Sequence, residues 1–277
     1  MAMKILYIGF LLLLASLYSC NGISQPNYHF VDIKGKKQHV LTLGKGEPVV
    51  VFISGGGSDL EDFEPVQKEI SKITKTISYD KLGIGKSELA DSPRTLENVS
   101  MELRELIKKE GILKSPIILV GHSMGGFVAR YYLRLYPDNV KGLILIDPGS
   151  EYLEDEWRKI RTEKQLKSED SLLTAQIKLI PEGFKMEVFA YPQHDSILRT
   201  FDIDTDIPVV LMESNMFEKG DESDSLHIEL QKRLYREFVA TVPQTRLIST
   251  KKSGHFIQLD EPDLVIEAIE DIIQKVQ

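Results

Sequence analysis

The chain has 277 residues, of which 42% are hydrophobic and 27% charged, and its formal net charge is −8. This is an ordinary globular composition with enough apolar material for a large core, and an α/β fold of ~250 residues can still form a single domain. The negative balance argues against nucleic acid as a partner, because no surplus of basic residues is present to neutralise phosphates. The sequence carries no motif for a nucleotide or a metal cluster, so neither a cofactor nor a metal is expected.

Residues 1–20 have the pattern of an export signal. A short cationic start over residues 1–4 precedes an almost unbroken apolar run over residues 5–17. That run is too short to span a bilayer comfortably, and it has the length of a signal-peptide core. Cys20 is the only cysteine of the chain and stands where a signal would be cut. A single exported cysteine cannot form an internal disulfide, so the fold is expected to hold without one.

The end of this stretch, Leu17-Tyr18-Ser19-Cys20, resembles a bacterial lipoprotein signal, in which the cysteine is lipidated and becomes the new N-terminus. Tyr18 is bulkier than the small residue usual at that position. The resemblance implies an exported protein of the cell envelope that is anchored to a bacterial membrane through lipids on Cys20. Residues 21–27 would then be a short polar tether. An ordinary cleaved signal and an uncleaved N-terminal anchor are the alternatives.

Strand and helix patterns alternate from residue 28 to the C-terminus. Short, continuous apolar runs are typical of strands in a parallel sheet that is buried on both faces. After a hairpin over 30–43, such runs predict strands at 48–53, 76–79, 116–120, 142–148, 207–212 and 245–249. Apolar residues at three- and four-residue spacing predict helices at 59–74, 96–110, 225–241 and from 262 onward.

This alternation predicts an α/β fold with a doubly wound, mostly parallel sheet, in one domain over residues 28–277. Residues 149–206 break the alternation. They are charged at first and then more apolar, and we expect them to form a helical lid above the strand ends.

The other elements are expected to be arranged around the stretch Gly121-His122-Ser123-Met124-Gly125. A buried strand precedes it and a helix follows, so the serine is predicted to lie on a sharp strand-to-helix turn. The two glycines suit such a turn, because the backbone there passes too close to its neighbours for side chains. The hydroxyl would project above the sheet beside a helix N-terminus, which is a good place for a nucleophile and for stabilising an oxyanion.

Three stretches together resemble the signature motifs of the α/β-hydrolase family, and they occur in the family's order. They are the turn at 121–125, Tyr79-Asp80-Lys81-Leu82-Gly83-Ile84-Gly85-Lys86-Ser87, and Ser253-Gly254-His255. The resemblance covers the chain from about residue 28 onward except the lid. It implies Ser123 as the nucleophile and His255 as the base. Serine is a poor nucleophile at neutral pH and needs such a base, which returns the proton to the leaving group.

An oxyanion requires two backbone N–H donors. One is expected at Met124, the residue that follows the nucleophile. The other is expected in Ser54-Gly55-Gly56-Gly57, which stands where relatives carry His-Gly-x directly after a buried strand. The resemblance implies Gly56 as this donor, with Gly57 as the next candidate. Serine in place of histidine at position 54 leaves a backbone donor unaffected.

The acid of the triad is less clearly marked. Most relatives carry it just after the strand that corresponds to 209–212, but here no aspartate stands at the expected offset. Asp147 ends the strand next to the nucleophile strand, which is the alternative position of the acid in this fold, and it keeps the order Ser, acid, His. Asp147 is therefore the predicted acid, with Glu213, Glu218 and Asp221 in reserve.

These features predict a serine hydrolase that acts on a small-molecule ester or related acyl bond through an acyl-enzyme. Amide and carbon–carbon bond cleavage use the same machinery. Serine at position 123 argues against dehalogenase and epoxide-hydrolase chemistry, for which relatives place aspartate. The apolar stretches of the lid favour a modest hydrophobic acyl or alcohol group. A catalytically silent ligand-binding or sensing protein on the same fold is the alternative. His122 and Arg130 are expected to be a local helix-start residue and a helix-surface residue.

Overall fold

The computed structural model describes residues 27–203, 205–216, 222–242 and 244–277. The predicted signal over residues 1–20, the lipidation site Cys20 and all but the last residue of the predicted tether lie outside this range. The first strand begins at Asn27, one residue before the predicted start of the domain. Within the described part of the chain, every helix is too short or too polar to cross a bilayer.

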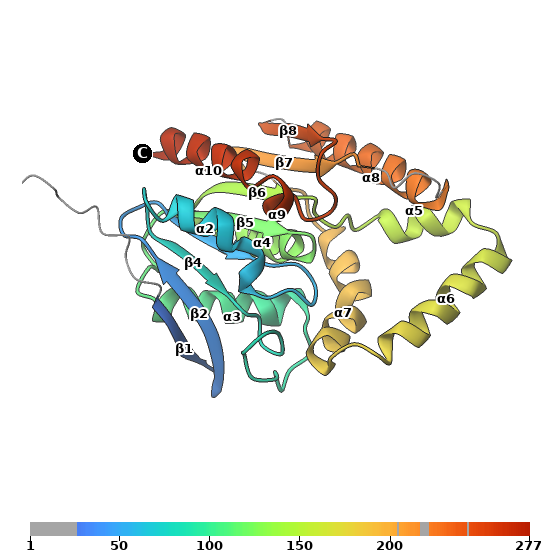
Figure 1. The fold of residues 1–277 in the computed structure, drawn as a ribbon, viewed down its shortest axis with the longest axis horizontal. Helices are drawn as coiled ribbons and strands as arrows, with labels where there is room; N and C mark the ends of the chain where they lie inside the picture. The colour runs from blue at the N-terminus through green and yellow to red at the C-terminus, as the bar shows by residue number, and fades with distance from the viewer. Residues whose placement is uncertain (1–26, 204, 217–221, 243) are drawn as a thin grey trace, which may run out of the picture.

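The centre of the molecule is an eight-stranded sheet with the order β1-β2-β4-β3-β5-β6-β7-β8. β1 pairs antiparallel with β2, and β2 pairs antiparallel with β4. All remaining neighbours in the sheet are parallel (Figure 1). The strands are β1 (Asn27–Ile33), β2 (Lys36–Leu43), β3 (Val49–Ile53), β4 (Thr76–Tyr79), β5 (Ile117–His122), β6 (Val140–Ile146), β7 (Val209–Ser214) and β8 (Thr245–Thr250). The predicted doubly wound, mostly parallel sheet is confirmed.

Helices cover both faces of the sheet (Figure 1). The helices and 3₁₀ turns outside residues 149–206 are η1 (Leu60–Phe63), α2 (Glu64–Ile70), α3 (Leu96–Lys109), α4 (Met124–Leu135), η2 (Pro137–Asn139), α8 (Glu222–Thr241), α9 (Ile257–Asp260) and α10 (Pro262–Val276). The helix predicted over 59–74 is shorter than expected, because its start is a 3₁₀ turn and it ends at Ile70.

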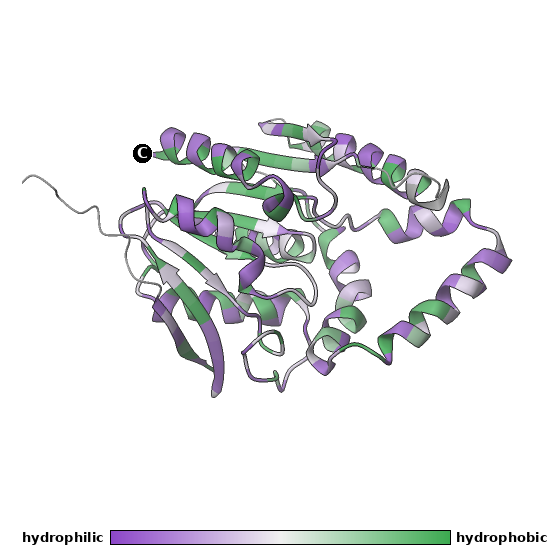
Figure 2. Ribbon diagram, viewed as in Figure 1, coloured by the Kyte–Doolittle hydropathy of each residue, from purple (hydrophilic) through white to green (hydrophobic). Residues whose placement is uncertain are grey.

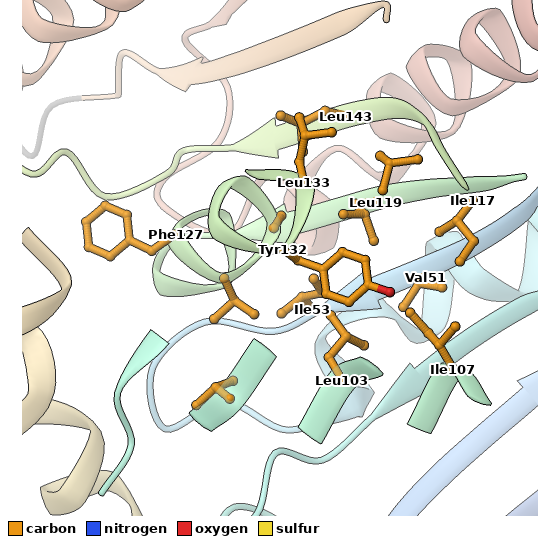
Figure 3. Packing of buried hydrophobic residues seen from close by; sticks show 14 of the residues in the cluster. Val51, Ile53, Leu103, Ile107, Ile117, Leu119, Phe127, Tyr132, Leu133 and Leu143 are labelled. Carbon is orange, nitrogen blue, oxygen red and sulfur yellow. The ribbon is translucent and has the colours of Figure 1, made fainter. Parts of the chain in front are cut away.

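Two cores form because successive strand residues face opposite sides of the sheet. On one side Val51 and Ile53 pack with α3, α4 and α8, as the contacts of Leu103 and Tyr132 show in Figure 3. On the other side Val50 and Phe52 pack with α2, α9 and α10. Figure 2 shows the same division, with apolar central strands and a hydrophilic outer side on α10. All five residues of β3 are buried, as its continuous apolar sequence predicts.

Residues 149–206 contain three helices, α5 (Leu153–Ile160), α6 (Glu163–Ile177) and α7 (Glu182–Leu198). In Figure 1, α5 lies along α8, α7 lies beside the carboxyl ends of the strands, and α6 projects away from the body between them. No residue of α6 is buried. Its own N-terminus is well formed, because Thr162 and Gln165 make a reciprocal capping box.

Candidate active site

Ser123 lies on the sharp turn between β5 and α4, with φ 52° and ψ −121°. A positive φ is unfavourable for a residue with a side chain, so neighbouring groups must hold it in place. A Cβ atom on Gly121 would lie 2.5 Å from the carbonyl oxygen of Gly125, and one on Gly125 would lie 2.1 Å from the carbonyl oxygen of Ile53. Only glycine fits at these two positions, which explains the spacing of the motif.

Strand register brings Ser123 and Asp147 together at the carboxyl edge of the sheet. His122 of β5 pairs with Ile146 of β6, and the amide of Ser123 donates to the carbonyl oxygen of Ile146 at 3.0 Å. The next residue of each strand therefore leaves the sheet at the same place. Asp147 also has a positive φ of 40°, and its amide donates to the carbonyl oxygen of Met212 on β7 at 2.8 Å.

His255 lies between β8 and α9, and its side chain contacts Asp147. The distance from His255 Nδ1 to Asp147 Oδ2 is 2.8 Å. The side chain of His255 is 47% exposed and that of Asp147 is 9% exposed. The buried carboxylate therefore faces one ring nitrogen, and the other nitrogen is left for the cavity that also contains Ser123.

The other carboxylate oxygen of Asp147 is held by two groups that the sequence did not mark. The amide of Ser214 lies 3.2 Å from Asp147 Oδ1, and the hydroxyl of Tyr235 lies 3.3 Å from it. The single hydroxyl proton of Tyr235 is shared between Asp147 Oδ1 and the carbonyl oxygen of Pro148, which lies nearer at 2.6 Å, and the hydroxyl oxygen accepts from Gln231 Nε2. Burial raises the pKa of Tyr235 well above its ordinary value, so the phenol stays neutral and remains a donor.

The loop that carries His255 is fixed from two sides. Ser214 Oγ donates to the carbonyl oxygen of Ser253 at 2.6 Å, and His122 Nε2 donates to the carbonyl oxygen of His255 at 2.9 Å. The rings of His122 and His255 also lie 4.6 Å apart between centroids. Burial lowers the pKa of His122 to about 3, so this imidazole is neutral near neutral pH and adds no charge beside His255.

The predictions for His122 and Arg130 are wrong. His122 is the last residue of β5 and is 1% exposed, so it is a buried support of the His255 loop and not a helix-start residue. Arg130 is only 5% exposed. Its two terminal nitrogens donate to the two carboxylate oxygens of Glu151 at 2.6 and 2.7 Å, and this bidentate ion pair compensates the buried charge. The helical pattern around position 130 gave no sign of a distant carboxylate that could compensate a buried charge.

The glycine loop after β3 lies against the serine turn. A Cβ atom on Gly55 would be 3.2 Å from Cβ of Ser123, and one on Gly56 would be 3.8 Å from Sδ of Met124. The amide of Gly57 donates to Glu187 Oε2 at 2.8 Å, so it is engaged elsewhere. Within the described residues, the amides of Gly56 and Met124 donate to no protein group. These are the two donors that the sequence predicted for the oxyanion.

A cavity of about 450 Å³ opens above these groups. Ser123, Asp147 and His255 line it together. The remaining wall is mainly apolar and comes from α5, α7, α8 and the segment after β7, through Leu153, Tyr191, Ile228, Tyr235 and Met216. The cavity can hold a small organic molecule with a hydrophobic part.

The reserve candidates for the acid do not contact His255 where they can be described. Glu213 is 1% exposed, and its Oε1 accepts from Ser249 Oγ at 2.6 Å and from Asn215 Nδ2 at 3.3 Å. Its carboxylate thus links β7 to β8. Glu218 and Asp221 lie outside the described residues. Over the part of the chain that the structure covers, no three His, Cys, Asp or Glu side chains are grouped so that they could hold a metal ion.

Known proteins share this fold. A family model described as alpha/beta hydrolase fold matches residues 48–172. An uncharacterised protein of Bacillus subtilis, YbdG, is 35% identical over 121 residues, which are 43% of this chain and 37% of that protein. Two solved structures superpose on 91% of this chain. The epoxide hydrolase CorEH has a TM-score of 0.66 and 17% sequence identity, and 100% of its own length is covered. A thermophilic esterase from Thermogutta terrifontis has a TM-score of 0.65 and 21% sequence identity, and 99% of its length is covered.

At such low identity the structural likeness shows the fold alone. Together, the sheet order and the family model over residues 48–172 show that the chain has the α/β-hydrolase fold.

Proposed function

We propose that the protein is a serine hydrolase that cleaves an ester or a related acyl bond through an acyl-enzyme. Ser123 Oγ attacks the carbonyl carbon while His255 Nε2 takes its proton. The amides of Gly56 and Met124 bind the oxyanion of the tetrahedral intermediate. The carbon–oxygen bond to the leaving alcohol then breaks, and His255 returns the proton to that alcohol. Water adds to the acyl-enzyme with His255 again as the base, and release of the carboxylic acid restores Ser123.

The observation that carries this proposal is the contact of 2.8 Å between His255 Nδ1 and Asp147 Oδ2 in the cavity that Ser123 lines. A carboxylate in this position orients the imidazole and stabilises the imidazolium that forms during attack. The positive φ of Ser123 keeps its side chain above the sheet, where a substrate could reach it. A serine at this turn supports acyl transfer over the aspartate-based chemistry expected of dehalogenases and epoxide hydrolases.

The cavity supports a small ester with one hydrophobic part as the substrate. Its volume of about 450 Å³ and its mainly apolar wall suit a modest acyl or alcohol group. A panel of p-nitrophenyl esters of increasing acyl length tests this directly. We expect kcat/KM to pass through a maximum at a short or medium chain. A steady rise to long-chain esters would contradict the size argument.

Covalent labelling tests the serine mechanism. A fluorophosphonate probe is expected to label the wild-type protein, and Ser123→Ala is expected to abolish both labelling and ester turnover. His255→Ala provides a second variant that leaves the serine in place and should slow labelling strongly. Folded wild-type protein that is neither labelled nor active would favour the alternative, a silent ligand-binding protein on this fold.

The N-terminal pattern supports the further proposal that the enzyme is exported and held at a membrane by lipids on Cys20. Cys20→Ser is expected to release the protein into the soluble fraction after cell disruption. Unchanged membrane fractionation of that variant would contradict lipidation and favour an uncleaved N-terminal anchor.

A further inference from the structure

Lys81 is a buried cation beside the glycine loop, and the proposed reaction does not use it. It follows β4 and is 1% exposed. Its Nζ donates to the carbonyl oxygen of Gly55 at 2.6 Å and to that of Ser54 at 3.1 Å. A buried ammonium needs such partners, because leaving water is costly for a charge. Here both hydrogen-bond partners are backbone groups of the loop that carries Gly56.

Glu187 completes this arrangement from helix α7. Its side chain is fully buried, and its Oε1 lies 3.3 Å from Lys81 Nζ. Its other oxygen accepts the amide of Gly57 at 2.8 Å. The loop is therefore held on both sides of Gly56, by a cation at the preceding carbonyl groups and by an anion at the following amide.

The geometry of the peptide bond links Lys81 to the oxyanion donor. The carbonyl of Gly55 and the N–H of Gly56 belong to the same planar peptide unit, and in a trans peptide they point in opposite directions. A hydrogen bond from Lys81 to that carbonyl therefore directs the N–H of Gly56 away from Lys81. The positive charge at the oxygen also polarises the amide and makes its N–H a stronger donor.

Helix α7 is well fixed, so Glu187 has a stable position. A Cβ atom on Gly183 would lie 1.8 Å from the carbonyl oxygen of Gly83, which means that the start of α7 rests directly on the loop after β4. Farther along the helix, His194 Nε2 donates to the carbonyl oxygen of Arg94 at 2.8 Å. Phe184 and Tyr191 of the same helix face the glycine loop, within 3.3 Å of a Cβ atom placed on Gly56.

We propose that Lys81 and Glu187 are positioning residues of the oxyanion hole, and that this ion pair orients and polarises the peptide unit whose N–H is the Gly56 donor. The inference rests on the proposed serine-hydrolase function. Its chemical consequence is specific. Loss of the pair weakens the binding of the tetrahedral intermediate and leaves the binding of the ground-state ester unchanged.

The double variant Lys81→Met with Glu187→Gln tests this consequence. It removes both charges together, so no unpaired ion remains in the interior, and such exchanges are often neutral for stability. Arg94→Met with Glu102→Gln is the matched control. That pair is also buried. Its two contacts are both 2.7 Å long, and it donates to no group of the glycine loop.

Four quantities are measured with a p-nitrophenyl ester of the best chain length. They are kcat, KM, and the inhibition constants of a trifluoromethyl ketone and of its unfluorinated analogue. The fluorinated ketone forms a hemiketal with Ser123 that places an oxyanion in the hole. We expect the double variant to lose about 10- to 100-fold in kcat, up to the cost of one missing oxyanion donor. Affinity for the fluorinated ketone should fall in parallel, while KM and binding of the plain ketone stay the same.

A folded double variant whose kcat stays within about threefold of wild type would overturn the inference. It would also be overturned if KM and plain-ketone binding changed as much as kcat, or if the control pair lost kcat equally. Should the double variant not fold, the isosteric Glu187→Gln alone is expected to lower kcat several-fold at constant KM, and an unchanged kcat would overturn the inference. Wild-type protein that is not labelled at Ser123 would instead contradict the proposed function itself.

Discussion

Replacing Asp147 by asparagine is the sharpest test of the proposed triad of Ser123, His255 and Asp147. Two donors face Asp147 Oδ1, the amide of Ser214 at 3.2 Å and the hydroxyl of Tyr235 at 3.3 Å. In Asp147→Asn the carboxamide oxygen is expected to stay with these donors, so its NH₂ group turns to His255. Facing a donor, Nδ1 must become the acceptor, and the ring proton moves to Nε2. The imidazole then presents a proton, and not a lone pair, to Ser123.

The magnitude follows from the loss of charge and of tautomer. An imidazolium and a carboxylate with charge centres about 4 Å apart attract each other by ~4 kcal/mol at an effective dielectric constant of ~20, which is about 10³-fold in rate. His255 is 47% exposed, which weakens this attraction toward its value in water, whereas the wrong tautomer adds to the loss. We therefore expect kcat to fall by roughly 10²- to 10⁴-fold with little change in KM.

The assay is steady-state hydrolysis of a p-nitrophenyl ester, with a thermal melt to confirm that the variant is folded. Glu213→Gln is the matched control, because Glu213 is also buried near the carboxyl end of a parallel strand, β7, but binds Ser249 and Asn215. We expect its kcat to stay within about threefold of wild type. Turnover of Asp147→Asn near the wild-type rate would refute the assignment, and a large loss in Glu213→Gln would transfer the role of the acid to that residue.

Three further changes test the scaffold. Gly125→Ala places a Cβ atom 2.1 Å from the carbonyl oxygen of Ile53 and should cost about 3 kcal/mol or more in urea unfolding. Burial raises the pKa of Asp195 to about 7, so the folded state retains a proton that the unfolded state releases, and stability falls as pH rises from about 4 to 7. Asp195→Asn should remove this loss and stabilise the protein at pH ~8 by on the order of 1 kcal/mol, with no gain at pH ~4, in thermal melts. For His122, whose pKa falls to about 3, only the unfolded state gains a proton between about pH 6.5 and 3. In His122→Gln, unfolding should therefore take up about one proton fewer in this pH range, so the free energy of unfolding should fall less steeply as the pH is lowered.

Local pattern was sufficient to predict the elements that carry Ser123 and Asp147. The apolar run of β5, the glycines around Ser123 and the periodicity of α4 are properties of adjacent residues, and they define a strand, a turn and a helix. The position of Asp147 followed from the end of β6 in the same way. In a parallel sheet, the carboxyl ends of neighbouring strands meet at one edge, so a correct order of strands brings these residues together.

The supporting groups could not be predicted, because their contacts depend on how distant elements pack. Tyr235 reaches Asp147 from 88 positions away, through the face that α8 turns toward the sheet. Glu187 is an acidic residue of a helix and, by pattern, would be assigned to a solvated surface. Periodicity identifies an apolar face, but it does not show which charged side chain will find a buried partner such as Lys81.

The contacts of α7 also divide the segment predicted as a lid. Glu187 binds the glycine loop and Gly183 lies on the loop after β4, so an outward movement of α7 would break the ion pair with Lys81 and release the peptide unit that presents the Gly56 amide. Helix α6 has no buried residue, and its ion pairs, Glu169 with Arg161 and Asp170 with Arg158, are made to the end of α5 and not to the glycine loop. Entry of substrate past α7 would thus dismantle the proposed oxyanion hole, whereas displacement of α6 would leave it intact. Glu151 and α5 are also held, by the buried ion pair with Arg130 and by the packing of α5 on α8, so α6 is the part of residues 149–206 that could move during the proposed reaction.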